Sequence, residues 1–383
     1  MVQRNAEKKV RLFAKQFRAL AIVGPRQSGK TTLAKTVFPK KQYVSLEDPD
    51  ERSLALQDTR FFLSRFKNGA IIDEAQRAPE LFSYLQSIID KSGKNAQFIL
   101  TGSNNFLLQQ SISQSLAGRI GYIDLLPFTL SEIKQAGVIF KQPEEWILKG
   151  CYPEIYDRKR KPDIWYPSYI RTYAERDVRQ IKNIGNTNQF TKFLRLCAGR
   201  TGQLLNINAL SIDSSLDMRT VQAWISILES SYIIYLLKPH SANYNKRLVK
   251  TSKLYFHDTG LACSLLGIKT VKELELSHFR GALFENAVIN EIQKHNANNI
   301  KSNDLFFWRD NKGIEIDLLI DAGTKRVPVE IKASQTFNVE YLKNINYWNG
   351  LSGNKNGVLF YGGNKTFDLP DNIKVKSWKD ISL

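Results

Sequence analysis

The stretch GPRQSGKT at residues 24–31 decides the fold of the first part of this chain. It fits the pattern G-x-x-x-x-G-K-[ST] and lies between a short apolar run, residues 19–23, and a helix-like segment, residues 32–38. A glycine-rich turn between a strand and a helix lets backbone N–H groups surround a phosphate at the positive end of the helix dipole. The stretch therefore predicts a P-loop, also called a Walker A motif, that binds a nucleotide.

Individual P-loop positions predict individual contacts. The Lys30 ammonium is expected to reach the β and γ phosphates, and the Thr31 hydroxyl to bind Mg²⁺. The residues expected to line the nucleotide are Gly24, Pro25, Arg26, Gln27, Ser28, Gly29, Lys30, Thr31 and Thr32. ATP and Mg²⁺ are accordingly the cofactors that this motif predicts.

A second apolar run, at residues 69–74, ends in the two carboxylates Asp73 and Glu74, as is typical of a Walker B strand. Asp73 is expected to hold the Mg²⁺ through water, and Glu74 to polarise the attacking water as the base in hydrolysis. An Asp-Glu pair also ends ordinary solvated strands, but after a P-loop it indicates ATP hydrolysis.

A third predicted strand, at residues 97–100, is followed by a polar run. Ser103 or Asn104 is the candidate to orient the water beside the γ phosphate, and a simple turn is the alternative.

The order of these motifs, followed by LAGRI at residues 116–120, resembles the AAA+ branch of the P-loop ATPases. Residues 24–33, 73–81 and 100–107 are similar to a widespread bacterial and archaeal ATPase family. Its members place an AAA+ domain before a winged-helix segment and a C-terminal domain similar to PD-(D/E)xK nucleases, and the resemblance covers nearly the whole chain. It implies an α/β fold: an AAA+ parallel sheet with helices on both faces, a winged-helix middle and an α/β nuclease-like end.

The same resemblance implies that Arg119 is an arginine finger or a sensor arginine, which places positive charge on the transferred phosphoryl group. A solvated arginine at a helix end is the alternative. If a neighbouring copy supplies Arg119, the active species is a homo-oligomer.

The middle of the chain has the pattern of a winged helix. Helical patterns at residues 189–198, 207–212 and 218–230 precede apolar strand patterns at residues 232–237 and 253–256. The candidate DNA contacts are Arg219 and Gln222 for base edges, and Lys246, Arg247 and Lys250 for phosphates. Winged helices also dock proteins, so a protein partner is the alternative.

The last segment carries a helical glutamate, Glu285, and two alternating strand patterns with Asp317, Glu330 and Lys332. Helical Glu, strand Asp and E-x-K together resemble the PD-(D/E)xK nuclease constellation. By that resemblance Glu285, Asp317 and Glu330 hold a hard cation, and Lys332 stabilises charge on a scissile phosphate. The alternative is a half-exposed strand whose charged side chains are solvated.

Composition favours a polyanionic partner. Lys and Arg outnumber Asp and Glu by 55 to 37, a formal net charge of +18. The excess is +8 in residues 1–140 and +9 in residues 141–270, but only +1 in residues 271–383. No stretch approaches the roughly 18 apolar residues that a membrane span needs, the first ten residues lack a secretory apolar core, and the three cysteines lie far apart. We therefore expect a cytoplasmic protein without a membrane partner.

The sequence as a whole predicts three segments: an AAA+ ATPase domain at residues 1–140, a helical and winged-helix domain at 141–270, and a nuclease-like domain at 271–383. The predicted function is Mg²⁺-dependent ATP binding and hydrolysis, with the nucleotide state coupled to DNA engagement. Two alternatives stay open. One is a nucleotide-controlled protein-docking switch on a degenerate nuclease scaffold, and the other is an ATP-licensed, metal-dependent DNA nuclease.

Overall fold

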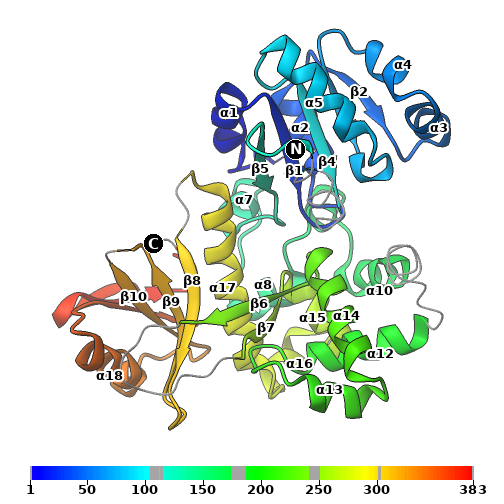
Figure 1. The fold of residues 1–383 in the computed structure, drawn as a ribbon. Helices are drawn as coiled ribbons and strands as arrows, with labels where there is room; N and C mark the ends of the chain where they lie inside the picture. The colour runs from blue at the N-terminus through cyan, green and yellow to red at the C-terminus, as the bar shows by residue number, and fades with distance from the viewer. Residues whose placement is uncertain are drawn as a thin grey trace. The chain divides into compact units, whose positions relative to one another are not determined.

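The computed structural model describes residues 2–103, 112, 115–173, 187–240, 251–300, 303–323 and 325–381. The predicted site residues Asn104, Lys246, Arg247 and Lys250 lie outside these ranges. The chain forms two compact units, each with its own sheet (Figure 1). Unit 1 comprises Met1–Phe128, Ser230–Tyr232 and Ala297–Ile300, and unit 2 comprises Thr129–Glu229, Ile233–Asn296 and Lys301–Leu383.

Unit 1 is built on a parallel sheet of five strands in the order β2-β3-β4-β1-β5, which confirms the predicted α/β class. The strands are β1 (Ala19–Val23), β2 (Gln42–Ser45), β3 (Ala70–Asp73), β4 (Phe98–Gly102) and β5 (Ile120–Asp124). All residues of β1, β3 and β4 are buried, because both faces of the sheet are covered.

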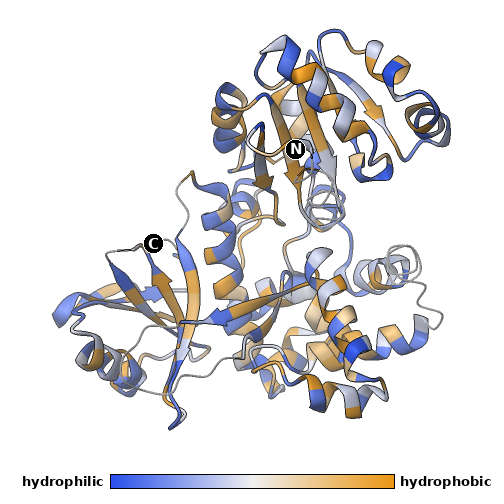
Figure 2. Ribbon diagram, viewed as in Figure 1, coloured by the Kyte–Doolittle hydropathy of each residue, from blue (hydrophilic) through white to orange (hydrophobic). Residues whose placement is uncertain are grey.

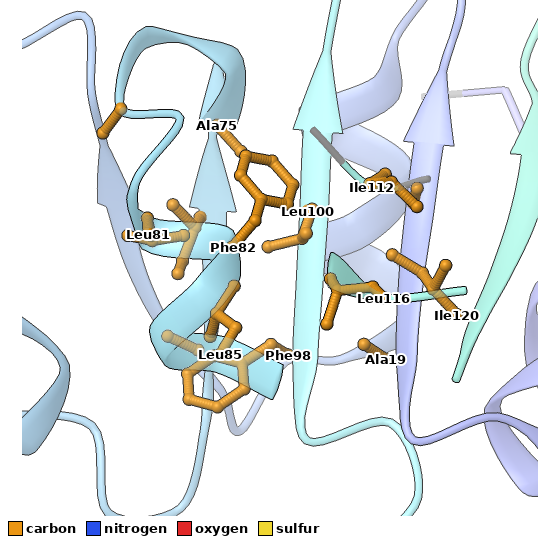
Figure 3. Packing of buried hydrophobic residues seen from close by; sticks show 14 of the residues in the cluster. Ala19, Ala75, Leu81, Phe82, Leu85, Phe98, Leu100, Ile112, Leu116 and Ile120 are labelled. Carbon is orange, nitrogen blue, oxygen red and sulfur yellow. The ribbon is translucent and has the colours of Figure 1, made fainter. Parts of the chain in front are cut away.

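Alternate residues of the strands supply two separate cores. Ala19, Ala21 and Val23 of β1 pack on one face, with side chains of α3 (Pro49–Gln57), α4 (Thr59–Ser64) and α5 (Leu81–Ser92). Figure 3 shows Phe82 and Leu85 of α5 against Phe98 and Leu100 of β4 in this core. Leu20 and Ile22 pack on the opposite face, with side chains of α1 (Glu7–Gln16) and α2 (Lys30–Val37). The helices therefore cover both faces of the sheet, as the period-two pattern of strands requires.

Unit 2 combines a group of helices with a mixed sheet. Its helices are α7 (Leu130–Gln135), α8 (Pro143–Lys149), α9 (Pro153–Asp157), α10 (Pro162–Thr172), α12 (Thr187–Ala198), α13 (Ile207–Ser214), α14 (Met218–Ser230), α15 (Thr259–Leu266), α16 (Val271–Leu276), α17 (Arg280–Asn298) and α18 (Lys343–Ser352). In Figure 2, orange hydrophobic and blue hydrophilic residues alternate along several of these helices, as is typical of amphipathic helices. Among the described residues, no helix is long and apolar enough to cross a lipid bilayer.

The sheet of unit 2 has eight strands in the order β12-β13-β11-β10-β9-β8-β6-β7. They are β6 (Ile234–Pro239), β7 (Lys253–Phe256), β8 (Asp304–Arg309), β9 (Glu315–Asp321), β10 (Arg326–Lys332), β11 (Gly357–Tyr361), β12 (Phe367–Leu369) and β13 (Ile373–Ser377). The antiparallel pair β6–β7 lies where the sequence predicts two wing strands, but β6 also pairs in parallel with β8. β7 pairs with residues 234–237 of β6, and β8 pairs with Lys238 and Pro239 at the end of the same strand. One sheet thus contains strands from both sides of the expected boundary at residue 270.

Other contacts join the same two segments. Trp146 of α8 stacks on Trp378 with ring centres 6.1 Å apart, and the Arg280 guanidinium lies 2.7 Å from a carboxylate oxygen of Glu144. Residues 141–270 and 271–383 therefore share one compact unit rather than forming two separate bodies.

Two glycines with positive φ angles provide a matched stability test in unit 1. Gly69 precedes the strand that carries Asp73, has φ +77°, and has the Gln97 carbonyl oxygen only 1.7 Å from where a Cβ would lie. Gly93 ends α5 with φ +63° and open space around it. We expect Gly93→Ala to lower the free energy of unfolding by about 1–2 kcal/mol, the cost of left-handed backbone alone. Gly69→Ala should cost clearly more, because a backbone carbonyl must also move. Urea denaturation of both variants checks this, and equal losses would contradict the predicted steric clash.

Candidate functional site

The P-loop follows β1 at the carboxyl edge of the sheet of unit 1. Val23, the last residue of β1, pairs with Gly102 of β4 and Asp124 of β5. Gly24 follows with φ +148°, and a Cβ there would lie 2.2 Å from the carbonyl oxygen of Leu125. Only glycine allows this approach, which lets the loop turn back toward the start of α2.

Lys30 and Thr31, the first two residues of α2, lie where the P-loop pattern places them. The buried Lys30 ammonium donates to the carbonyl oxygens of Gly24 at 3.1 Å and Pro25 at 2.7 Å. The Thr31 hydroxyl donates to Asp73, with its oxygen 3.0 and 3.1 Å from the two carboxylate oxygens. Thr31 and Asp73 therefore bring hard oxygen donors together, which is the donor chemistry that Mg²⁺ prefers beside nucleotide phosphates.

Two further hydroxyls hold Asp73 and were not predicted. Thr101, within β4, donates to one carboxylate oxygen, and the Tyr43 hydroxyl donates to the other at 2.9 Å. Burial and the neighbouring Asp73 carboxylate raise the pKa of Tyr43 to about 12, so its hydroxyl keeps its proton and remains a donor. These donors fix the orientation of Asp73 without adding positive charge.

Glu74 is turned away from the strand by its backbone. Its φ is +54°, a left-handed conformation that costs a residue with a Cβ about 1–3 kcal/mol and persists where surrounding contacts enforce it. The Ser103 hydroxyl donates to its carboxylate at 3.1 Å, and the Gln76 amide donates to the same oxygen. The structure thus brings two of the predicted site residues, Glu74 and Ser103, into contact.

Arg119 lies at the other edge of the sheet. It directly precedes β5, and its carbonyl accepts from the amide of Ala19, the first residue of β1. The P-loop begins after the last residue of β1, about 13 Å further along the strand. The Arg119 side chain instead donates to Asp90 at 2.8 Å, and Arg18 donates to the same oxygen at 2.8 Å. A sensor role toward the chain's own nucleotide does not fit this position, because the length of the sheet separates them.

In unit 2 the predicted carboxylates form part of a larger group, the lysine–carboxylate cluster. Its members are Lys253, Glu285, Glu315, Asp317, Glu330 and Lys332. The Lys332 ammonium lies 2.6 Å from Glu330 and 3.3 Å from Asp317. The Lys253 ammonium, supplied by β7, lies 3.2 Å from Glu285 and is also paired with Glu315. Two ammonium groups therefore stand between four carboxylates.

The same contacts involve the residues of the predicted metal site, which stays a prediction. The part of the chain that the structure describes contains no group of three or more His, Cys, Asp or Glu side chains that could hold a metal ion. Glu285, Asp317 and Glu330 each have an ammonium partner, and Lys332 bonds to two carboxylates instead of remaining open for a phosphate. Lys253 is the residue whose role the sequence did not suggest, because it appeared only as the start of a wing strand.

Burial makes these charges interdependent. Burial destabilises the charged form of Glu330, and the neighbouring Asp317 carboxylate does so as well. Together they raise the pKa of Glu330 to about 8. Burial together with Asp317 raises the pKa of Glu285 to about 7, although Lys253 opposes the shift. Burial alone would lower the pKa of Lys332, but Asp317 and Glu330 raise it above its usual range.

The exposed face of α14 carries both described candidates for DNA contact. Arg219, Gln222 and Ser226 are exposed, at the spacing of one helix face. The opposite face packs into the core through Val221, Trp224, Ile225, Ile227 and Leu228. The structure places α12 and α13 before this helix, and a single bridge joins Leu204 to Lys253 of β7.

Comparison with protein families divides the chain into three parts. Residues 16–134 match a model described as an AAA domain. Residues 140–272 and 280–381 match two models that are each described as a domain of unknown function.

Three curated relatives are each described as an uncharacterized protein. Two uncharacterized proteins, from Mycobacterium tuberculosis and Mycobacterium bovis, are each 29% identical over 338 residues, which span 87% of this chain and 74% of the relative. An uncharacterized protein of Haemophilus influenzae is 22% identical and covers 61% of this chain and 60% of its own length.

Two solved structures resemble the chain distantly. The Walker-type ATPase PABY2304 of Pyrococcus abyssi is 16% identical with a TM-score of 0.48, over 69% of this chain and 96% of its own. A signal-transduction ATPase with a tetratricopeptide repeat sensor, from Pyrococcus horikoshii, is 12% identical with a TM-score of 0.26, over 77% and 48%. Neither likeness is close enough to carry an assignment.

The AAA-domain match and the P-loop geometry together answer the question of enzyme class. The matched residues include the P-loop, the Asp73–Glu74 strand end and the polar end of β4. The chain is a P-loop ATPase, which binds and hydrolyses ATP, as the sequence predicts.

The raised pKa values in the lysine–carboxylate cluster predict how stability depends on pH. A carboxyl whose pKa is higher in the folded than in the unfolded chain stabilises the fold at low pH and loses that contribution as pH rises through the folded pKa. The stability of unit 2 should therefore fall from about pH 4.5 to about pH 8 and then level off. Thermal unfolding across this range checks the sign.

Glu330→Gln, which keeps the shape without the charge, should flatten this slope and raise the unfolding temperature at the alkaline end. Glu340→Gln, at an exposed position, is the matched control and should leave the slope unchanged. A Glu330→Gln slope identical to that of the wild type would contradict a raised pKa at Glu330.

Proposed function

We propose that this ATPase couples its nucleotide state to DNA binding by unit 2. One observation carries the proposal. Helix α14 presents Arg219 and Gln222 to solvent above an apolar face anchored by Trp224. Arginine and glutamine suit bidentate contacts to guanine and adenine edges, and an exposed helix of this width fits the major groove.

The surroundings of α14 support the same proposal. Three helices, α12 to α14, precede the antiparallel β6–β7 pair, in the order of a winged-helix module. Residues 141–270 carry a net charge of +9, which suits a phosphate backbone. In the proposed complex Lys246, Arg247 and Lys250, between the two strands, contact phosphates.

The three cysteines are free and buried, which is consistent with a protein that functions in the reducing cytoplasm.

In the proposed reaction Thr31 and Asp73 would hold Mg²⁺ beside the nucleotide phosphates. When bound, the cation neutralises charge on the phosphate oxygens. Lys30 turns from the loop carbonyls toward the β and γ phosphates. Glu74 accepts a proton from the attacking water, and Ser103, bonded to the Glu74 carboxylate, orients that water.

A protein-docking switch is the second candidate function, and the lysine–carboxylate cluster favours it over a nuclease. A nuclease-like fold whose Asp317 and Glu330 are both bonded to Lys332 has no open carboxylate pair for a catalytic cation. In either proposal residues 271–383 serve as a scaffold of nuclease-like ancestry that supports α14 through the shared sheet.

We further propose that Arg119 acts as an arginine finger for the nucleotide of a second copy. Its position at the start of β5 excludes the chain's own site, and the side chain is partly exposed beside Asp90. The active form in this proposal is a homo-oligomer in which each copy completes its neighbour's site.

ATP hydrolysis should respond to DNA. We expect duplex DNA to stimulate steady-state hydrolysis by the wild type, with the stimulation weakening as salt rises, because phosphate contacts release counterions. Glu74→Gln should bind ATP and DNA but lose at least a hundredfold in kcat. The measurements compare duplex DNA, single-stranded DNA and no DNA at stated salt concentrations.

Arg219→Ala should raise the Kd for duplex DNA about tenfold and leave hydrolysis without DNA unchanged. Lys272→Ala, on the exposed side of α16, is the matched charge control and should bind DNA like the wild type. Hydrolysis that ignores DNA, with wild-type DNA affinity in Arg219→Ala, would shift the assignment to the protein-docking switch.

Subunit mixing tests the trans role of Arg119. A Glu74→Gln copy supplies an intact Arg119, and an Arg119→Ala copy supplies an intact Glu74, so mixing two weakly active variants should restore part of the hydrolysis rate. Mixing Glu74→Gln with Lys30→Ala should restore none, because neither copy then holds both ATP and its base. Equal rates in the two mixtures would rule out a shared site.

A further inference from the structure

Unit 1 contains a buried arginine that the reaction described above does not use. Arg4 precedes α1, and only 8% of it is exposed. Its guanidinium donates through Nη1 to the Ser28 carbonyl at 2.6 Å and through Nη2 to the Leu126 carbonyl at 2.6 Å. The guanidinium carbon also lies 5.0 Å from the centre of the Phe128 ring. A guanidinium is costly to bury unless fixed acceptors receive its donors, and here two backbone carbonyls do so.

The first of these carbonyls belongs to the P-loop itself. The Ser28–Gly29 peptide is trans, so its C=O and its N–H point in opposite directions. Arg4 holds the carbonyl, and the Gly29 amide therefore points away from Arg4. Among the described residues this amide has no protein acceptor, and the buried Ser28 hydroxyl oxygen next to it has no hydrogen-bond partner either. Gly29 also precedes α2, whose first turn offers partial positive charge.

The second carbonyl ties Arg4 to the other end of the P-loop. Leu126 follows Leu125, the residue whose carbonyl lies against Gly24 at the start of the loop. The Arg4 guanidinium thus links two places. One is the Ser28 carbonyl near the end of the P-loop, and the other is the segment at Leu126 that packs against the beginning of the P-loop. A lysine would offer both carbonyls one compact ammonium on a flexible stem, instead of two donors held apart in a rigid plane.

We propose that Arg4 is a positioning residue for the nucleotide phosphates. Its bond to the Ser28 carbonyl keeps the Gly29 amide turned toward the phosphates, and its charge polarises that peptide and strengthens the amide as a donor. Arg4 acts through the backbone and touches no reacting atom. The inference rests on the ATPase activity and names a residue outside the P-loop that sets phosphate affinity.

The test measures the Kd of ATP and of inorganic tripolyphosphate, together with KM and kcat, for Arg4→Met and Arg4→Lys. We expect Arg4→Met to raise both Kd values and KM at least tenfold, about the loss of one charge-assisted hydrogen bond, with kcat retained. Arg4→Lys, which keeps the charge but loses the planar fork, should give Kd values between those of the wild type and Arg4→Met. Millimolar guanidinium should lower the Kd of Arg4→Met toward the wild-type value. If Arg4 had only a structural role, added guanidinium would not restore the phosphate affinity.

Arg11→Met is the matched control. Arg11 lies in α1, is exposed, and pairs with Glu7 at 2.7 Å, so its loss should leave the phosphate affinity unchanged. Wild-type Kd values in Arg4→Met, with only a lower unfolding temperature, would overturn the proposal. If Arg4→Met does not fold, Arg4→Lys carries the test, and wild-type affinity for tripolyphosphate in that folded variant would overturn it equally.

Discussion

The hydrogen-bond register between β1 and its two neighbours is the constraint on which the ATPase site depends. Because β1 lies between β4 and β5, and β4 lies between β1 and β3, the P-loop, the Thr101 hydroxyl and the Asp73 carboxylate emerge at one edge of the sheet. A shift of the register by one residue would turn every side chain of the shifted strand to the opposite face of the sheet and move these groups out of reach of one another. Burial on both faces opposes such a shift.

The buried carboxylates of the two units have different kinds of partner. Asp73 is surrounded by the neutral hydroxyls of Thr31, Tyr43 and Thr101, which orient it and leave its charge uncompensated. Asp317 and Glu330 instead share the single Lys332 ammonium as a partner. An uncompensated carboxylate attracts a cation, whereas one that is already paired gains little from another. This physical difference separates a site suited to chemistry from one suited to holding strands together.

The sequence could predict what depends on local pattern. The P-loop, the Asp73–Glu74 strand end and Ser103 follow from short motifs between a strand and a helix, and the bounds Met218–Ser230 of α14 match the expected helix. It could not predict contacts between distant residues. Nothing in the spacing of Arg4, Tyr43 or Thr101 marks them as neighbours of the P-loop region, and Lys253 carries no motif at all. The metal site was inferred from a resemblance to the PD-(D/E)xK constellation, and that pattern could not reveal that lysines stand between the carboxylates.

The pairing of β6 with β8 bears on how the protein could be divided for study. A fragment that stops near residue 270 would retain the β6–β7 hairpin but lose the strand that bonds to the other side of β6. The exposed backbone edge would then be open to pairing with other chains, a common route to aggregation. Because the sheet continues through β13, a fragment of unit 2 that behaves as a separate protein would have to extend to Ser377 and keep every strand between.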